Sequence, residues 1–229
     1  MTTATRACHG LFSEREGRAE REVLGTSAMA YTEYNNWDRS AAVQRALAHA
    51  DSSGASCDDG KYIFNFAFGS NLNPDKVASR KMFPKVVLRG VLHAWRLLFN
   101  HVGGYGNIES VAMCASSQLD LSTLCSPPAE VHGVLLKLTR DEFSRLAWEE
   151  YAYDTVEVHV KLYDDDRRQG NGEHQAALAF KSNPCALASS RTLPSARYIG
   201  LICDGAQASG IEPQYCSWLN SLRSECRGR

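Results

Sequence analysis

Alternating hydrophobic positions mark the first strand that the sequence predicts. From Lys61 to Phe68 every second residue is aromatic, the period of a β-strand with one buried face. Gly69 ends the alternation, and Asn73 followed by Pro74 is typical of a helix N-cap and first helical position. The pattern predicts a strand, a tight loop and a short helix.

The rest of the chain continues with short strand patterns and few helices. A helix begins after Thr139, where Thr139 and Glu142 have the spacing of a capping box. A helical C-terminal region, 195–224, is broken at 210–213. Further strands are predicted at 86–93, 95–100, 107–115, 131–138, 155–163 and 175–180. This content favours a mixed α/β fold, a small closed or nearly closed β-barrel flanked by short helices.

The N-terminal region has a different pattern. Residues 13–22 alternate acidic and basic side chains, which is typical of a solvated helix or a disordered tract. Residues 40–50 could form an alanine-rich helix, and 51–56 resemble a linker. We expect a partly helical or disordered extension over 1–58 and one domain over 59–229. The extension could pack on the domain, bind a protein partner or do neither.

Composition and charge narrow the class of protein. The 229 residues are 44% hydrophobic and 22% charged, with a formal net charge of -1. Such a chain has no field to attract nucleic acid or an anionic membrane, and it lacks the roughly 20-residue apolar run of a membrane span. It also lacks a secretory signal. We expect a cytoplasmic protein in a reducing environment, although an organelle is also compatible.

The cysteines and histidines do not suggest a metal site. Eight cysteines are scattered along the chain without a Cys-x-x-Cys pair, and the seven histidines are equally dispersed. Without a secretory signal, reduced thiols are the simpler expectation. We assign no metal.

The loop over 66–72 is the first candidate for chemistry. Backbone N–H groups between a strand and a helix start can bind a carboxylate or hold a developing oxyanion. An ordinary strand-to-helix turn explains the same local pattern. Ser70 is a poor candidate for a catalytic-triad serine, because the Gly-x-Ser-x-Gly spacing is absent.

The helix after Thr139 supplies a candidate carboxylate. Its apolar stripe, Phe143, Leu146 and Ala147, is continued at i+7 by Glu150, whereas Glu149 lies on the charged face. A carboxylate is costly to bury without a partner. Glu150 therefore either keeps its head in water at the rim or faces a cleft where it acts.

Several short motifs follow one another in order along the chain: 64–72, Leu98-Phe99-Asn100, Gly106-Asn107-Ile108, 131–134, Leu146 with Glu150, Tyr198, Ile202, Gly205-Ala206, 210–213, Tyr215 and Leu219. Over about residues 62–222 they resemble the gamma-glutamylcyclotransferase family. The loop motif is short but fairly specific, because the related glutathione-specific branch usually has Tyr-Gly-Ser-Leu there, without an asparagine such as Asn71.

The resemblance implies a small α/β barrel and a cofactor-free conversion of γ-glutamyl amino acids to 5-oxoproline and the free amino acid. Glu150 matches the general acid/base, with Glu149 as the runner-up. The implied substrate-binding residues are Asn65, Phe66, Ala67, Phe68, Gly69, Ser70, Asn71, Leu72 and Tyr198. The partners to consider are a small γ-glutamyl peptide as substrate, a second copy in a homodimer, and a protein bound by the extension.

The implied reaction sets a requirement for the acid/base. An α-ammonium has a pKa of about 8 and an ordinary glutamate one of about 4.3, so proton transfer between them is uphill by roughly 5 kcal/mol. A partly desolvated Glu150 would bind the proton more tightly and narrow the gap.

The chain departs from the family pattern close to this site. Phe68 and Asn65 stand where tyrosines are usual, and Ala147 and Tyr151 replace an aspartate and a glycine around the glutamate. Two alternatives therefore stay open: a weakly active or inactive domain that serves as a binding or assembly subunit, and a glutathione-specific cyclotransferase.

Overall fold

The fold was analysed in a computed structural model of the chain. The structure describes residues 38–116, 127–167, 173–188 and 193–227. The predicted acidic and basic tract at 13–22, and with it most of the N-terminal extension, lies outside the described residues.

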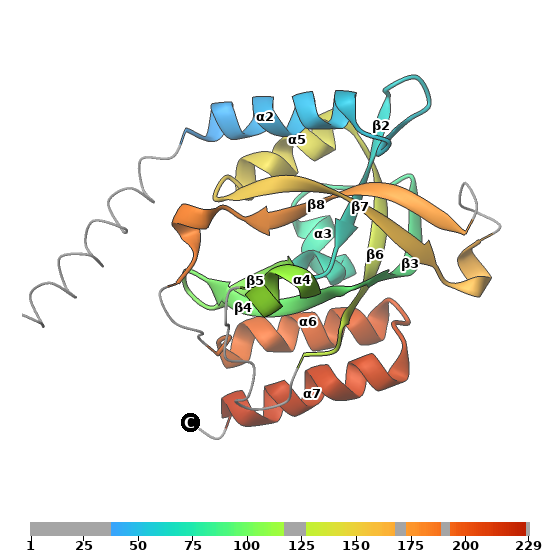
Figure 1. Cartoon of the computed structure of the whole chain (residues 1–229). Coiled ribbons are helices and arrows are strands. Elements are labelled where there is room, and N and C mark those ends of the chain that lie inside the picture. The colour runs from blue at the N-terminus through green and yellow to red at the C-terminus, as the bar shows by residue number, and fades with distance from the viewer. Residues whose placement is uncertain (1–37, 117–126, 168–172, 189–192, 228–229) are drawn as a thin grey trace, which may run out of the picture. The chain divides into compact units, whose positions relative to one another are not determined.

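A closed β-barrel forms the centre of the domain, which confirms the predicted fold class (Figure 1). The strands run in the order β1-β2-β6-β3-β7-β8, and an additional pairing of β2 with β8 closes the barrel. Their bounds are β1 Ser56–Cys57, β2 Tyr62–Ala67, β3 Val86–His93, β6 Glu130–Thr139, β7 Tyr153–Leu162 and β8 His174–Ser182.

The closing pair is the parallel one, between β2 and β8. Asn65 pairs with Leu178 and Phe66 with Ala179, and the buried Asn65 amide donates a hydrogen bond to the Leu178 carbonyl over 2.8 Å. Nearby, a Cβ atom at Gly133 would lie 2.4 Å from the Ala67 carbonyl oxygen. Only glycine permits this close approach of β6 to the end of its neighbour β2.

A separate hairpin of β4 (Trp95–His101) and β5 (Tyr105–Ser110) packs beside the barrel. The predicted strand over 107–115 is wrong in its second half, because residues 111–116 form the helix α4 (Val111–Ser116). The Ser110 hydroxyl accepts a 3.2 Å hydrogen bond from the Met113 N–H, the contact of a helix N-cap. The cap and the following alanines favour the helix over continued alternation.

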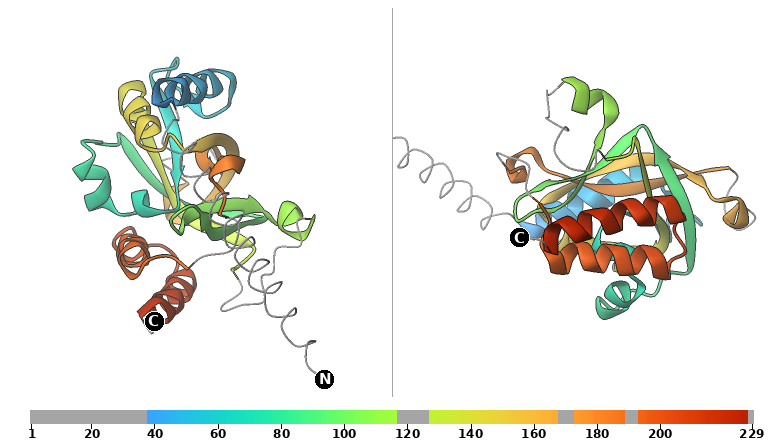
Figure 2. Two further views of the ribbon diagram at one scale, coloured as in Figure 1. Left: turned by 90° about the vertical axis from the view of Figure 1, so that its left-hand side faces the viewer. Right: turned by 90° about the horizontal axis from the view of Figure 1, so that it is seen from below.

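Helices cover two opposite sides of the barrel (Figures 1 and 2). One pair is α6 with α7, which are joined by a short turn, and the other is α2 with α5. Among the described residues no helix is long and apolar enough to span a bilayer. The bounds are α2 Arg39–Ser52, α3 Pro74–Ser79, α5 Arg140–Glu149, α6 Ala196–Ala208 and α7 Pro213–Arg227, with short 3₁₀ turns η1 Ser70–Leu72, η2 Asp164–Asp166 and η3 Pro184–Ala186.

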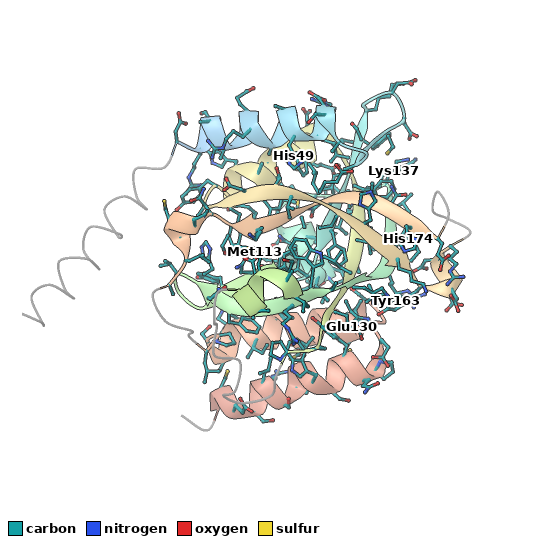
Figure 3. All side chains as sticks on the ribbon, viewed as in Figure 1. His49, Met113, Glu130, Lys137, Tyr163 and His174 are labelled. Carbon is teal, nitrogen blue, oxygen red and sulfur yellow. The ribbon has the colours of Figure 1, made fainter. Side chains whose placement is uncertain are left out.

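Helix α2 confirms the predicted alanine-rich helix and packs on the barrel domain. It buries Ala42, Ala46 and Ala50, and the His49 Nδ1 atom hydrogen-bonds to the Thr155 hydroxyl of β7 over 2.8 Å (Figure 3). The predicted linker over 51–56 is instead the end of α2, a turn and the start of β1. Of the three roles left open for the extension, packing on the domain is the one that residues 38–58 have.

Helix α6 approaches the loop after β2 through a glycine. A Cβ atom at Gly205 would lie 2.6 Å from the backbone N and Cα atoms of Asn73. A larger residue would therefore push α6 away from the loop and the start of α3. Gly200 on the same helix has room, since its nearest neighbour would be Arg223 at 3.6 Å.

The N-terminus of α5 is anchored by Glu142, as the capping box predicts. One carboxylate oxygen accepts the Thr139 N–H and hydroxyl at 2.9 and 2.8 Å, and the other accepts the Phe83 N–H at 2.7 Å. Burial opposes ionisation of Glu142, but these hydrogen bonds outweigh it and hold its pKa below the usual value of 4.5. The buried carboxylate thus ties α5 to the segment between α3 and β3.

Replacing Glu142 with glutamine should destabilise the fold in a pH-dependent way. A lowered pKa contributes stability above the unfolded value, and this contribution is lost as the pH falls through the folded value. We expect Glu142→Gln to reduce the free energy of unfolding by about 2 kcal/mol at pH 7. The difference should shrink below pH 4.5, the usual pKa of the carboxyl. Urea denaturation at pH 7 and in acid measures both values. Glu149→Gln, on an exposed position of the same helix, should change stability by less than about 0.5 kcal/mol.

The two glycines of α6 provide a matched pair. Gly205→Ala should lower the free energy of unfolding by about 1–3 kcal/mol, because the methyl group meets the backbone of Asn73. Gly200→Ala should raise it by up to about 1 kcal/mol through helix propensity. Thermal or urea denaturation of the two variants compares them directly. Equal effects of the two substitutions would contradict the close packing of α6 on the loop.

Candidate active site

The loop after β2 is a single 3₁₀ turn that leads into α3. The Leu72 N–H donates to the Gly69 carbonyl over 2.9 Å, and the Asn73 side chain accepts from the N–H groups of Asp75 and Lys76 as the predicted N-cap. Gly69 has a negative φ of -105°. Its lack of a side chain matters for space instead, because a Cβ atom there would lie 3.1 Å from the Tyr198 hydroxyl.

Tyr198, in the first turn of α6, reaches the loop with its hydroxyl. This oxygen accepts the Gly106 N–H over 3.0 Å, and the Ser70 backbone also hydrogen-bonds to it. Burial raises the pKa of the Tyr198 phenol above its usual value, so the group is neutral at physiological pH. Because both contacts use the oxygen as acceptor, the hydroxyl proton is available to donate to a ligand.

Glu150 closes the other side of the loop. It is the C-cap residue of α5, and its side chain is 17% exposed. The Oε1 atom accepts hydrogen bonds from the Asn71 amide at 3.1 Å and from the Arg80 guanidinium at 2.8 Å. The same Arg80 nitrogen donates to the Asn71 side-chain oxygen at 2.9 Å. Both contacts fall on Oε1, so Oε2 has no hydrogen-bond partner among the described residues.

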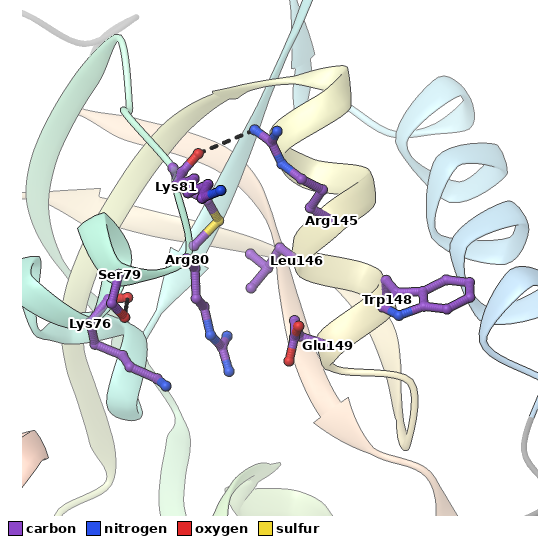
Figure 4. A pocket seen from close by; sticks show the side chains of 9 residues that line it. Lys76, Ser79, Arg80, Lys81, Arg145, Leu146, Trp148 and Glu149 are labelled. Carbon is purple, nitrogen blue, oxygen red and sulfur yellow. Dashed lines mark hydrogen bonds between the residues drawn. The ribbon is translucent and has the colours of Figure 1, made fainter.

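The neighbouring carboxylate, Glu149, lies elsewhere. It is exposed and lines a separate pocket between α3 and α5 (Figure 4). The two adjacent glutamates of α5 thus face different surroundings, and only Glu150 contacts the loop. The apolar stripe read from the sequence separates the same two glutamates, with Glu150 on the stripe and Glu149 on the charged face.

A small cavity of about 40 Å³ lies between the loop, Glu150 and Tyr198. Its volume suffices for a water-sized group and not for a whole substrate, so a larger ligand must displace side chains at its mouth. Glu150, which lines this cavity, and its partner Arg80 are both partly exposed. The lining residues are Asn65, Phe66, Ala67, Phe68, Gly69, Ser70, Asn71, Gly106, Glu150, Tyr153, Phe180 and Tyr198.

An aromatic wall holds one side of this cavity. The Tyr153 hydroxyl donates to the Gly106 carbonyl over 3.1 Å, and its ring stacks on His101 with 4.2 Å between centroids. Burial lowers the pKa of His101 to about 4, so the imidazole is neutral and serves as a packing surface at physiological pH. The wall fixes Gly106, whose N–H in turn positions the Tyr198 hydroxyl.

The structure brings most of the sequence-predicted residues together at this cavity. Among the predicted substrate-binding residues Leu72 is the exception: it is 1% exposed, packs in the core and does not line the cavity. Asn65 lines it, although its amide is used to close the barrel. Phe68, which replaces the usual tyrosine, is buried and packs 6.3 Å from Phe66 between ring centroids.

Sequence reasoning missed four neighbours of the site: Arg80, Gly106, Tyr153 and Phe180. Gly106 belongs to a segment that resembles the family, which is the only signal that pointed to it. Arg80 is placed by the end of α3, where Lys81 has a φ of +55° and the Met82 N–H donates to the Val77 carbonyl over 3.3 Å. This resembles a Schellman C-cap. The sequence around the cap does not indicate that Arg80 contacts Glu150.

The arrangement suits proton transfer beside a carbonyl group. A carboxylate can take up and return a proton, and a neutral phenol can donate to an oxygen. The Gly69 and Asn71 N–H groups have no acceptor among the described residues and could hold an anionic oxygen. In the same part of the chain, no group of three or more histidine, cysteine, aspartate or glutamate residues could bind a metal ion.

Comparison with known sequences points to one family. Residues 130–219 match the model of the AIG2-like family, a segment that includes both Glu150 and Tyr198. The chain is 28% identical over 177 residues to gamma-glutamyl cyclotransferase gliK from Aspergillus fumigatus. That alignment covers 70% of this chain and 62% of the relative, so the match spans less than two thirds of the relative's length.

Solved structures agree at the level of the fold. A structure of gamma-glutamyl cyclotransferase is similar with a TM-score of 0.50 and 22% identity, over 70% of this chain and 87% of that one. A gamma-glutamyl cyclotransferase specific to glutathione, from yeast, has a TM-score of 0.53 and 11% identity, over 73% and 99% of the two chains. Together with the closed barrel, these similarities show that the chain has the fold of the gamma-glutamyl cyclotransferases.

Proposed function

We propose that this protein converts γ-glutamyl amino acids to 5-oxoproline and a free amino acid, without a cofactor and with Glu150 as the general acid/base. The observation that carries the proposal is the position of Glu150 against the loop, with Oε1 held by Asn71 and Arg80. It supports the role because the second carboxylate oxygen keeps no hydrogen-bond partner among the described residues, and Glu150 lines the cavity together with Tyr198.

The reaction is an intramolecular aminolysis. The substrate's α-amine attacks its own γ-carbonyl carbon, a bond forms between them, and the bond to the leaving nitrogen breaks. The proton lost by the amine passes to Glu150 and from there to the departing nitrogen, so the balance closes without another reactant. Because the nucleophile and the electrophile belong to one molecule, effective molarities of about 10⁵–10⁸ M are available once the chain is folded back.

The negative charge that develops on the γ-carbonyl oxygen needs donors. In one arrangement, the Gly69 and Asn71 N–H groups and the Tyr198 hydroxyl all donate to this oxygen. In the other, the two N–H groups bind the substrate's α-carboxylate, and the Tyr198 hydroxyl alone donates to the oxyanion. Tyr198 suits either arrangement because its neutral hydroxyl is oriented by the Gly106 N–H. Removal of one such donor typically costs a factor of about 10²–10³ in kcat.

Arg80 holds the acid/base against the loop. Its NH1 atom lies 2.8 Å from Glu150 Oε1 and 2.9 Å from the Asn71 side-chain oxygen, so the carboxylate has a fixed position. A bound substrate that competes for the guanidinium would release this contact.

Two substrate classes fit this site. One relative found in the comparison is described as specific to glutathione, and the motif Gly69-Ser70-Asn71 resembles the branch that acts on γ-glutamyl amino acids. In this structure Asn71 binds both Glu150 and Arg80. We therefore place γ-glutamyl amino acids first and glutathione second.

A binding or assembly domain is the second candidate function. Two observations favour it: the cavity volume of only about 40 Å³ and the ion pair of Arg80 with Glu150. A domain that binds no substrate needs neither a larger cavity nor a free carboxylate. The N-terminal extension, whose residues 1–37 lie outside the described part, would then supply a partner-binding segment. A partner that co-purifies only when residues 1–37 are present, together with absent turnover, distinguishes this candidate.

Substitution of the two adjacent glutamates tests the assignment of the acid/base. Glu150→Gln should lower 5-oxoproline release from γ-glutamyl-alanine by at least about 10²-fold, because the proton carrier is lost while the side-chain shape is kept. Glu149→Gln should reduce it by no more than about tenfold, since that side chain does not contact the loop.

The measurement is release of 5-oxoproline from γ-glutamyl-alanine and from glutathione by the full chain. Circular dichroism of each variant shows whether the fold is kept. Undiminished turnover in Glu150→Gln contradicts the role of Glu150. Absence of turnover by the wild type on both substrates contradicts the enzymatic proposal and favours the binding domain.

A further inference from the structure

A second and larger pocket lies beside the candidate active site, between α3 and α5 (Figure 4). Its volume is about 430 Å³, within the range of small-molecule sites in proteins. We call it the basic pocket. It is lined by Lys76, Ser79, Arg80, Lys81, Met82, Arg145, Leu146, Trp148 and Glu149.

The basic pocket concentrates positive charge. Lys76, Arg80, Lys81 and Arg145 line it, against a single carboxylate, Glu149. Lys76 and Lys81 form no ion pair within the described residues, and the Arg145 guanidinium donates to the Lys81 carbonyl over 3.2 Å. Two lysines without an ion-pair partner in the described part of the chain, next to two arginines, favour an anionic ligand.

Arg80 connects this pocket to the acid/base. It lines the basic pocket, and its NH1 atom contacts Glu150 Oε1 at 2.8 Å and Asn71 Oδ1 at 2.9 Å. A guanidinium has five N–H donors, and the contacts to Glu150 and Asn71 use one nitrogen. The remaining donors can bind a ligand carboxylate in the bidentate geometry that arginine favours.

We propose that the basic pocket binds the carboxylate of the leaving amino acid or peptide, and that Arg80 and Lys76 make the contacts. The substrate class is then γ-glutamyl compounds whose leaving group carries a free carboxylate. That this carboxylate belongs to a leaving group rests on the proposed function. Binding of a carboxylate in the pocket does not depend on turnover.

Covalent geometry supports this placement. The leaving nitrogen must lie within hydrogen-bond reach of Glu150 to receive its proton. In an α-amino acid the carboxylate oxygens are only about 3 Å from that nitrogen, three bonds and two carbons away. A carboxylate in this position falls within reach of a guanidinium that already touches Glu150. The pocket beyond Arg80 then has space for the remainder of the leaving group.

The pocket wall also suits an amino-acid side chain. Trp148, which is 45% exposed, supplies accessible apolar surface to the pocket, while Met82 and Leu146 line it from the core and are almost fully buried. Apolar surface next to charged groups binds both the stem and the carboxylate of an amino acid. Small to medium apolar leaving residues fit this combination.

Binding in this pocket would also act on the acid/base. When the leaving-group carboxylate takes up the Arg80 guanidinium, that guanidinium is shared with the ligand and is no longer held by Glu150 and Asn71 alone. A substrate without this carboxylate leaves the Arg80–Glu150 pair intact. Arg80 is therefore a positioning residue whose effect depends on the charge of the leaving group.

Titration calorimetry on the full chain tests the carboxylate site without turnover. The probes are N-acetyl-alanine, which has the acyl-amide and carboxylate of the leaving part, and N-acetyl-alaninamide, which has no charge. We expect the wild type to bind the acid about tenfold more tightly than the amide, the effect of a charge-assisted hydrogen bond. Lys76→Ala and Arg80→Ala should bring the ratio of the two dissociation constants close to one.

Lys61→Ala is the matched control, because it removes an exposed lysine at the opposite end of β2 and should keep the tenfold ratio. Equal or undetectable binding of both probes by the wild type, or a ratio unchanged in both pocket variants, overturns the proposal. A carboxylate preference that depends on Lys76 and Arg80 in a protein that releases no 5-oxoproline supports the pocket and refutes the cyclotransferase. Turnover without this preference refutes the pocket alone.

Discussion

Closure of the barrel between β2 and β8 is the contact on which the position of the site depends. Without the parallel pairing of Asn65 and Phe66 with β8, the strand before the loop would lie at an open edge, with unpaired backbone groups. The Asn65 amide adds a side-chain hydrogen bond to the same seam. The polar side chain that replaces the family's usual tyrosine therefore has a structural use, and the loop starts from a fixed point.

Elements far apart in the sequence then converge on that loop. α5 presents Glu150, α6 presents Tyr198, and the β4–β5 hairpin presents Gly106. Each approach depends on a small or capping residue: Gly205 admits α6, and Glu142 anchors α5. The catalytic chemistry that we propose uses few groups, while the packing that places them uses many.

Electrostatics distinguishes this site from a simple buried carboxylate. The sequence argument asked for a partly desolvated Glu150, and the structure adds the Arg80 guanidinium, which lies 2.8 Å from its carboxylate. In our proposal this contact changes when an anionic ligand engages Arg80 from the basic pocket, which would couple recognition of the leaving group to proton transfer.

Local sequence patterns determined much of the architecture. The period-two aromatics of β2, the Asn73-Pro74 helix start and the Thr139–Glu142 capping box depend on neighbours within a few residues, so they are visible in one dimension. The apolar stripe of α5 likewise separated Glu150 from Glu149. The same local reasoning failed after Ser110, where a single N-cap contact turns an alternating pattern into a helix.

Only the tertiary structure decided which groups meet. The ion pair of Arg80 with Glu150 joins residues 70 positions apart, and the contact of Tyr198 with Gly106 joins residues 92 apart. Such contacts depend on barrel closure and helix docking, for which a single sequence has no periodic signal. The sequence thus determined the strands, the loop and the candidate carboxylate, while the fold decided that this carboxylate shares an arginine with a basic pocket.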